Sequence, residues 1–289
     1  MIQDIYTGRS LSQAKPSNKR IMVGIPMTGL LRAEWVLARY GQVVPCNWSQ
    51  VDCLQWLDPH CPLRFMVADA RNIVVDAFCK DPDFEWLFFI DHDVILPQGV
   101  LLKINERMIK GDIPVWSGLY FTKSVPSEPL IYRGRGNGYY GKWELGDEVW
   151  VDGVHMGCTL IHGSILRAMY AESEPYDVMP GRTIRRVFET PSRVWYDPET
   201  LSWNTAQGTE DLEWCTRVMN EGWLAKAGWP KYQEMEFPFL IDTGIFCRHI
   251  DFNGVQYPSR NEHLEFVKSE DVSRRDAENA EKGKTKRAV

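Results

Sequence analysis

Several features that mark particular protein classes are missing from this sequence. No apolar run reaches the roughly 18 residues of a membrane-spanning helix, and residues 1–20 lack the apolar stretch of a signal peptide. The seven cysteines are odd in number and lack the paired short spacings of a zinc ribbon. The formal charge of -6 argues against a general nucleic-acid binder, which needs positive charge to neutralise phosphates. We therefore expect a reduced, cytoplasmic protein that has no membrane span and binds no nucleic acid.

The sequence does contain enough apolar material for one large domain, since 44% of its 289 residues are hydrophobic. In the first half, short apolar runs alternate with segments of helical periodicity. The patterns predict strands at 21–25, 42–48, 86–90 and 115–121 and helices at 30–40, 69–79 and 97–111. This alternation indicates an α/β fold with a mostly parallel central sheet flanked by helices.

The second half has a different character. Glycine, tyrosine, tryptophan and charge dominate 122–150, which predicts hairpins and loops. Further on, we expect a strand at 149–161 and helices at 164–171 and 208–222. Residues 172–206 have no clear periodicity and exceed ordinary connections in length, so they are a candidate flexible lid or acceptor loop.

These differences divide the chain into four parts. The predicted parts are a flexible lead-in (1–19), a nucleotide-binding half (20–121), a second half of the same domain with a smaller β and loop region (122–260), and a charged tail (261–289).

The clearest chemical signal is a pair of carboxylates at the end of an apolar strand. Residues 86–90 lead directly into Asp91, His92 and Asp93. In an open α/β sheet, ligands gather at the carboxyl ends of the strands. Two acidic oxygens there can hold Mg²⁺ or Mn²⁺, and the ion can in turn hold a diphosphate.

A second pair of acids lies late in the chain. Glu210 and Asp211 follow Thr209, which is a plausible N-cap, at the start of the predicted helix. The helix dipole favours acids in a first turn, so this placement alone could explain both carboxylates.

Taken in order, these segments resemble the GT-A glycosyltransferases, especially the family 2 type and the related Anp1-like mannosyltransferases. The resemblance covers roughly residues 21–252. It rests on Gly24-Ile25-Pro26, Ala70-Arg71-Asn72, Phe89 to Asp93, Ser117-Gly118-Leu119-Tyr120, Glu210-Asp211 and His249. It implies a GT-A, Rossmann-like fold in which 20–121 binds a nucleotide sugar and 122–260 binds the acceptor and carries catalysis.

The resemblance also implies a role for each candidate residue. The nucleotide sugar would contact Pro26, Met27, Thr28, Arg71, Asn72, Asp91, His92 and Asp93. A Mn²⁺ or Mg²⁺ ion would be bound by Asp91, Asp93 and His249, with Asp251 as the alternative to the histidine. The acceptor would contact Trp116, Asp152 and His155. Under the same resemblance, Arg71 and Asn72 either contact the nucleotide or fix the loop that carries Asp91 and Asp93. The competing interpretations are an ordinary turn for 26–28 and a structural salt bridge for Arg71.

The expected reaction transfers a sugar from a nucleoside diphosphate sugar to a hydroxyl acceptor such as a glycan. In inverting relatives an acid deprotonates the acceptor, and this role falls to Asp211, with Glu210 second. Retention of configuration stays open, because the Anp1-like relatives are retaining. Two other functions also stay open, namely a nucleotidyltransferase or sugar pyrophosphorylase, and a carbohydrate-binding protein without turnover.

Overall fold

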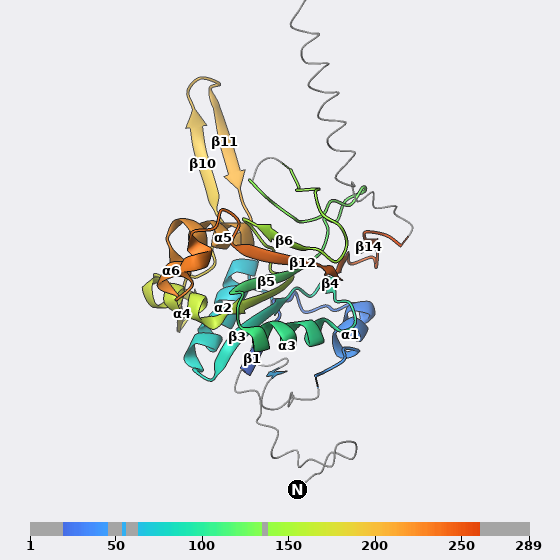
Figure 1. Ribbon diagram of the computed structural model, residues 1–289. Coiled ribbons are helices and arrows are strands. Elements are labelled where there is room, and N and C mark those ends of the chain that lie inside the picture. Colours follow the sequence, from blue (N-terminus) through green and yellow to red (C-terminus); the bar gives the residue numbers. More distant parts are fainter. Residues whose placement is uncertain (1–19, 46–53, 56–62, 135–137, 261–289) are drawn as a thin grey trace, which may run out of the picture.

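The computed structural model describes residues 20–45, 54–55, 63–134 and 138–260. The predicted lead-in at 1–19 and the charged tail at 261–289 lie outside these residues and are drawn as thin grey traces in Figure 1. Within the described part, no helix is both long and apolar enough to cross a membrane.

A seven-stranded mixed sheet forms the centre of the described structure (Figure 1). In spatial order its strands are β2 (Leu54–Gln55), β1 (Arg20–Gly24), β3 (Phe84–Ile90), β7 (Cys158–His162), β5 (Val115–Leu119), β12 (Phe239–Phe246) and β6 (Glu148–Val151). Strand β7 is antiparallel to both β3 and β5, and β6 is antiparallel to β12, whereas the other pairs are parallel. Both halves of the chain therefore contribute strands to one sheet.

Helices cover both faces of this sheet, which confirms the predicted α/β class. One face carries α1 (Ala33–Tyr40) and α3 (Val100–Lys110). The opposite face carries α2 (Val67–Lys80), α4 (Gly163–Glu172), α5 (Glu210–Asn220), α6 (Trp223–Lys226) and α7 (Pro230–Gln233).

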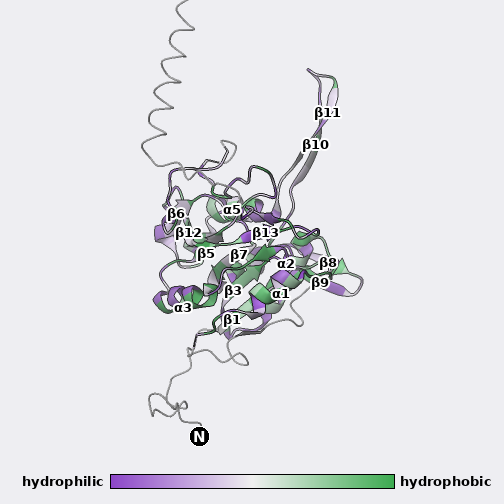
Figure 2. Ribbon diagram, turned by 90° about the vertical axis from the view of Figure 1, so that its right-hand side faces the viewer, coloured by the Kyte–Doolittle hydropathy of each residue, from purple (hydrophilic) through white to green (hydrophobic). Residues whose placement is uncertain are grey.

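Strand β3 shows why the sheet is covered on both sides. Phe88 and Ile90 pack in the apolar cluster beneath α1 and α3, whereas Leu87 and Phe89 pack in the cluster beneath α2 and α4. All four side chains are fully buried. Because successive strand side chains point to opposite faces, a continuous apolar run is the pattern of a strand with two buried faces. The hydrophobic colour of the central strands in Figure 2 follows from this pattern.

Three expectations about secondary structure were wrong. The described part of the strand predicted at 42–48, residues 42–45, forms no strand, and 46–48 lie outside the described residues. The strand predicted at 149–161 is interrupted, because residues 152–157 leave the sheet between β6 and β7. The stretch 172–206 is not an irregular loop. It contains two hairpins, formed by β8 (Pro175–Met179) with β9 (Arg182–Arg185) and by β10 (Ser192–Asp197) with β11 (Ser202–Gln207).

The β10–β11 hairpin projects from the body of the molecule, as both Figure 1 and Figure 2 show. Val194 and Trp203 are 62% and 72% exposed, so this hairpin has no core of its own. A strand without a buried face lacks the apolar alternation that marks other strands, which explains why the pattern did not predict it. Movement of this region as a lid stays a prediction.

A small sheet beside the central one completes the fold. It consists of β14 (Gln256–Tyr257), β13 (Arg248–Ile250) and β4 (Val94–Ile95), in that order. In this sheet His249 pairs with Val94, and the Ile250 amide donates to the Asp93 carbonyl at 2.8 Å. The late histidine is thereby held beside the Asp91 to Asp93 turn.

Candidate donor-binding and catalytic site

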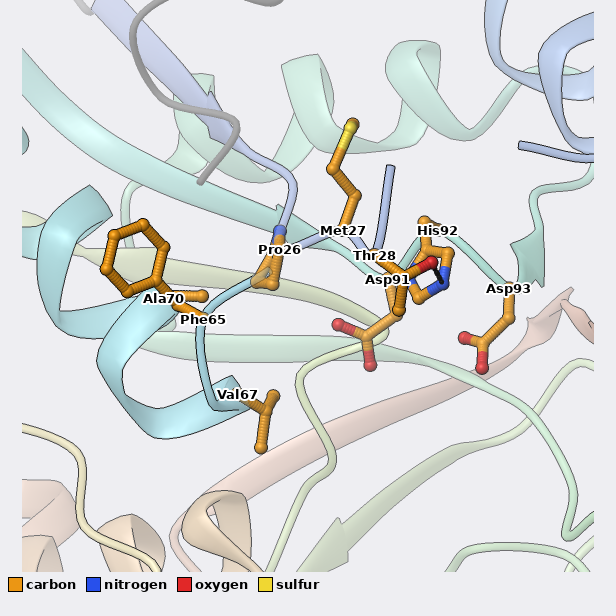
Figure 3. Close-up of a pocket in the computed structure, with 9 residues that line it drawn as sticks. All are labelled: Pro26, Met27, Thr28, Phe65, Val67, Ala70, Asp91, His92 and Asp93. Carbon is orange, nitrogen blue, oxygen red and sulfur yellow. Dashed lines mark hydrogen bonds between the residues drawn. The ribbon is translucent and has the colours of Figure 1, made fainter. Parts of the chain in front are cut away.

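A pocket opens where β1 and β3 end (Figure 3). These parallel strands are neighbours, with Gly24 paired to Phe89, so the segments that follow them meet at one edge of the sheet. The pocket is lined by Pro26, Met27, Thr28, Phe65, Val67, Ala70, Asp91, His92 and Asp93. All of the predicted nucleotide-binding residues except Arg71 and Asn72 line it.

Sequence reasoning missed the apolar wall of this pocket. Phe65 lies just before α2, and Val67 and Ala70 lie in its first turn, which starts at Val67 rather than near residue 69. Val67 extends the apolar pattern of the helix by two residues towards its N-terminus, and this extension was the available signal.

Arg71 joins the carboxylates of two distant segments. Its side chain is 2% exposed and donates from Nη2 to both oxygens of Asp91, at 3.0 and 3.3 Å, and from Nε to Glu210 at 2.9 Å. Burial raises the pKa of Asp91, and Arg71 opposes that effect only in part. The salt bridge of Arg71 therefore fixes the Asp91 turn, and contact of Arg71 with the nucleotide stays a prediction.

The turn after β3 is also fixed through its backbone. Trp35 donates from Nε1 to the Asp91 carbonyl at 2.9 Å, and the Asp91 amide donates to the Gly157 carbonyl at 3.2 Å. A Cβ atom at Gly157 would lie 2.8 Å from Val94, so only glycine permits this close approach. The Gly157 amide in turn donates to Tyr120 Oη at 2.9 Å. Asp91 is therefore held from both sides of the sheet edge.

Asp93 has a different environment, because its side chain is 29% exposed and pairs with the Lys123 ammonium. Burial alone would raise the pKa of the Asp93 carboxyl, but the hydrogen bond and charge of Lys123 lower it overall. His249 donates from Nδ1 to the Phe121 carbonyl, and its ring packs edge-on against Tyr120. With Nδ1 engaged in this way, Nε2 keeps the lone pair that a metal ligand needs.

The residues at this edge fit a divalent cation only in part. Within the described residues, no group of three His, Cys, Asp or Glu side chains could hold an ion by itself. Both oxygens of Asp91 accept from Arg71, so this carboxylate is a poor ligand as placed. Asp93 already pairs with a cation, the ammonium group of Lys123. Mg²⁺ and its analogues are usually bound by one or two protein ligands together with substrate phosphates. Asp93 and His249 could be these protein ligands.

Asp211 and His155 form a second charged pair near the same edge. His155 Nδ1 lies 2.6 Å from Asp211 Oδ2, and the Leu212 amide donates to Asp211 Oδ1 at 2.8 Å. The two side chains are 14% and 9% exposed. Thr209 occupies the N-cap position of α5, but its side chain makes no cap hydrogen bond. Glu210, the second candidate base, is instead engaged by Arg71.

Three predicted contact residues have structural roles instead. Asn72 accepts from the amides of Val187 and Phe188 at 3.0 and 2.7 Å and donates to the Phe188 carbonyl at 2.8 Å, so its amide group faces this loop rather than the pocket. Trp116 is fully buried in the core under α3, where a sugar cannot reach it. Asp152 is 9% exposed and accepts from the Gly134 amide at 2.9 Å, which fixes a loop.

Asp251, the alternative metal ligand, also stabilises a turn. Its Oδ1 accepts from the backbone amides of Asn253 and Val255, both at 2.9 Å. This leaves His249 as the better candidate of the two.

Comparison with known proteins adds little to this description. No protein-family model matches the chain, and no curated protein matches it. Among solved structures, the chain is similar to the one titled "Crystal Structure of A197 from STIV". The alignment covers 86% of this chain and 98% of that chain, with 16% sequence identity and a TM-score of 0.49. Likeness at this level gives no ground for assigning an activity, so an assignment depends on the residues of the site.

Proposed function

We propose that this protein is a glycosyltransferase of the GT-A type that binds a nucleoside diphosphate sugar in the pocket at the ends of β1 and β3. The observation that carries the proposal is the pocket itself. The segments 26–28 and 91–93, which the resemblance assigns to the donor, are far apart in the chain but line one cavity. The apolar wall formed by Phe65 and Val67 suits a nucleotide base, and Asp93 lies at the opposite, polar side (Figure 3).

The polar side of the pocket suits a diphosphate and a divalent cation. Asp93 and His249 would hold the ion, which when bound would offset the negative charge that develops on the leaving diphosphate. Lys123 forms an ion pair with the Asp93 carboxylate. Once that carboxylate binds a metal ion, the ammonium group can supply positive charge to the same phosphates. Arg71 pairs through Nε and Nη2 with Glu210 and Asp91, so its charge is directed chiefly at these two acids.

The acceptor site is the neighbourhood of Asp211 and His155. This pair and the donor pocket share one framework, since Arg71 connects Asp91 of the pocket to Glu210, the residue before Asp211. A base there would remove the proton of an acceptor hydroxyl while the oxygen attacks the anomeric carbon on the face opposite the diphosphate. The reaction would invert the configuration of the sugar, and the acceptor would be a glycan or another hydroxyl compound.

A turnover assay tests this proposal. The purified protein is incubated with Mn²⁺ and UDP-, GDP-, CDP- or dTDP-sugars, and release of the nucleoside diphosphate is measured for the wild type and Asp93→Asn. Asp112→Asn is the matched control. Asp112 is exposed and lies in the loop before β5, at the end of the strand that is opposite to the pocket.

We expect release from one donor type, a loss of at least a hundredfold in Asp93→Asn, and no change in Asp112→Asn. Pyrophosphate release from nucleoside triphosphates, with all diphosphate sugars left intact, would instead indicate a nucleotidyltransferase.

A further inference from the structure

The pairing with His155 orients the carboxylate of Asp211. Oδ2 accepts from His155 Nδ1 at 2.6 Å, and Oδ1 accepts from the Leu212 amide at 2.8 Å. Each oxygen therefore already has one partner that orients it. Each oxygen keeps a second lone pair, so Asp211 is disfavoured as the base by its low basicity and not by a lack of room for a hydrogen bond.

The other end of the imidazole is in the opposite situation. His155 Nε2 is buried and has no hydrogen-bond partner among the described residues. A buried polar atom without a partner is uncommon in folded proteins, and its presence requires an explanation such as a role in catalysis or ligand binding. Because Nδ1 donates to the carboxylate, the neutral ring carries its lone pair on Nε2, which is the arrangement of a general base.

Negative groups surround the ring. The carboxylates of Asp211, Glu210 and Asp91 act on it, and the rings of Tyr120 and Tyr132 pack against it with centroids at 6.0 and 5.6 Å. Burial lowers the pKa of His155, but Asp211 and the other acids outweigh it, and the pKa is raised overall.

The carboxylate of Asp211 shows the reverse effect. Burial raises its pKa, but the charge and hydrogen bond of His155, with help from Thr209 and Arg71, bring the pKa far below its usual range. A carboxylate of this kind is a weak base, so the proton of the pair belongs to the imidazole.

We propose that His155 Nε2 is the atom that accepts the proton of the acceptor hydroxyl, and that Asp211 is a positioning residue that holds the ring. This inference rests on the proposed glycosyl transfer and changes the base that sequence reasoning assigned. The O–H bond of the acceptor breaks and its proton moves to Nε2, while the oxygen electron pair forms the new bond to the anomeric carbon. The bond from that carbon to the diphosphate breaks, and its electron pair leaves with the diphosphate.

The acceptor would reach Nε2 from the side of Tyr132. This ring is partly exposed, whereas Tyr120, on another side of the imidazole, is 4% exposed and fixed by its bond to Gly157. A phenol ring beside the imidazole also offers an apolar face to a sugar.

The first test locates the proton without turnover. The ring resonances of His155 are followed by NMR between pH 4 and 9 in the full-length protein, assigned by their loss in His155→Gln, and compared with Asp211→Asn. We expect a titration midpoint above the ordinary 6.5 in the wild type and a lower one in Asp211→Asn. A wild-type midpoint at or below 6.5 would overturn the assignment of the proton.

The second test uses the pH dependence of kcat/KM for diphosphate release. The wild-type rate should rise with pH through the midpoint that NMR gives for His155. His155→Gln should lose this rise of the rate with pH and at least a hundredfold in rate, with KM for the donor unchanged. Asp211→Asn should shift the rise to lower pH. The control is His162→Gln, since His162 ends β7 at the opposite edge of the sheet.

The outcomes separate the two proposals. Turnover by the wild type with an unaltered pH profile and nearly full activity in His155→Gln would refute the role of His155 and leave the glycosyltransferase proposal standing. Absence of turnover in the wild type with every donor would refute the proposed function itself.

Discussion

Arg71 donates hydrogen bonds to both carboxylate oxygens of Asp91, at 3.0 and 3.3 Å, from a side chain that is only 2% exposed. Its Nε also reaches Glu210, so one guanidinium joins the end of β3 to the first turn of α5. The donor pocket and the acid pair of α5 are separated by more than a hundred residues of sequence, and this contact sets their distance in space. Four of the predictions below concern the charged groups at this edge of the sheet.

Replacement of Arg71 by methionine should destabilise the fold strongly. The variant leaves the buried Glu210 and the partly buried Asp91 without their shared cation, and breaking a buried ion pair costs roughly 3 to 5 kcal/mol. Urea denaturation measures the loss. Glu172→Gln, which removes a surface ion pair with Lys226, is the control and should cost less than about 1 kcal/mol. A loss as small in Arg71→Met as in the control would contradict the proposed link.

Asn72→Ala should reduce stability without weakening nucleotide binding. The side chain satisfies the amides of Val187 and Phe188 and the Phe188 carbonyl, and buried groups left without partners cost about 1 to 3 kcal/mol each. With three such groups we expect a loss of about 3 kcal/mol or more in urea denaturation. The dissociation constant of the bound nucleotide, measured by calorimetry at a temperature where the variant is folded, should stay within twofold. A large loss of affinity in a folded variant would restore the role in donor binding that the sequence suggested.

The pair of His155 and Asp211 should stabilise the protein in a defined pH range. The pKa of Asp211 is lowered on folding, so its contribution is present above its ordinary value of 3.8 and is lost in more acidic solution. The pKa of His155 is raised, so its contribution is complete below 6.5 and is lost as the pH rises through the folded value. The stability difference between wild type and Asp211→Asn should therefore be largest between these two values. Urea denaturation from pH 4 to 9 measures it, and a difference that grows steadily above pH 7 would contradict the pairing.

Removal of the Lys123 ammonium should favour a divalent cation at Asp93. In Lys123→Met the carboxylate loses its competing partner, and an ion pair as exposed as this one is worth up to about 1 kcal/mol, or roughly fivefold in affinity. We expect Mn²⁺ to bind about two- to fivefold more tightly when followed by electron paramagnetic resonance. In the double variant Lys123→Met with Asp93→Asn this gain should disappear. Equal Mn²⁺ affinity in wild type and Lys123→Met would show that the ion does not use Asp93.

The sequence predicted the strand that leads into Asp91 because β3 is buried on both faces and its apolar run stands out. It also placed Asp91 and Asp93 correctly at the edge of the sheet, because residues that directly follow an identified strand lie where that strand ends. The contacts between side chains were not predictable. Asn72 meets a loop 115 residues further along, and His155 meets Asp211 across 56 residues. Both residues of that pair were candidates, but for separate roles.

Burial was as hard to predict as these contacts. The resemblance made Trp116 a candidate for contact with the acceptor, yet it lies in β5 with its side chain in the core under α3. The strands β10 and β11 were missed for the opposite reason, since residues such as Trp203 are exposed and give no apolar alternation. In both cases burial depended on the tertiary structure, which local patterns do not contain.

The most direct test of the account is donor binding at Asp93. Thermal denaturation of the wild type, Asp93→Asn and Asp112→Asn is followed with UDP, GDP, CDP or dTDP, in Mn²⁺ or in EDTA. A nucleotide at a hundred times its dissociation constant adds roughly 2.7 kcal/mol of stability. We predict such a shift for one nucleotide in Mn²⁺, present in the wild type and Asp112→Asn and lost in EDTA and in Asp93→Asn. No shift with any nucleotide, or a shift indifferent to EDTA and to Asp93, would contradict the proposed donor site.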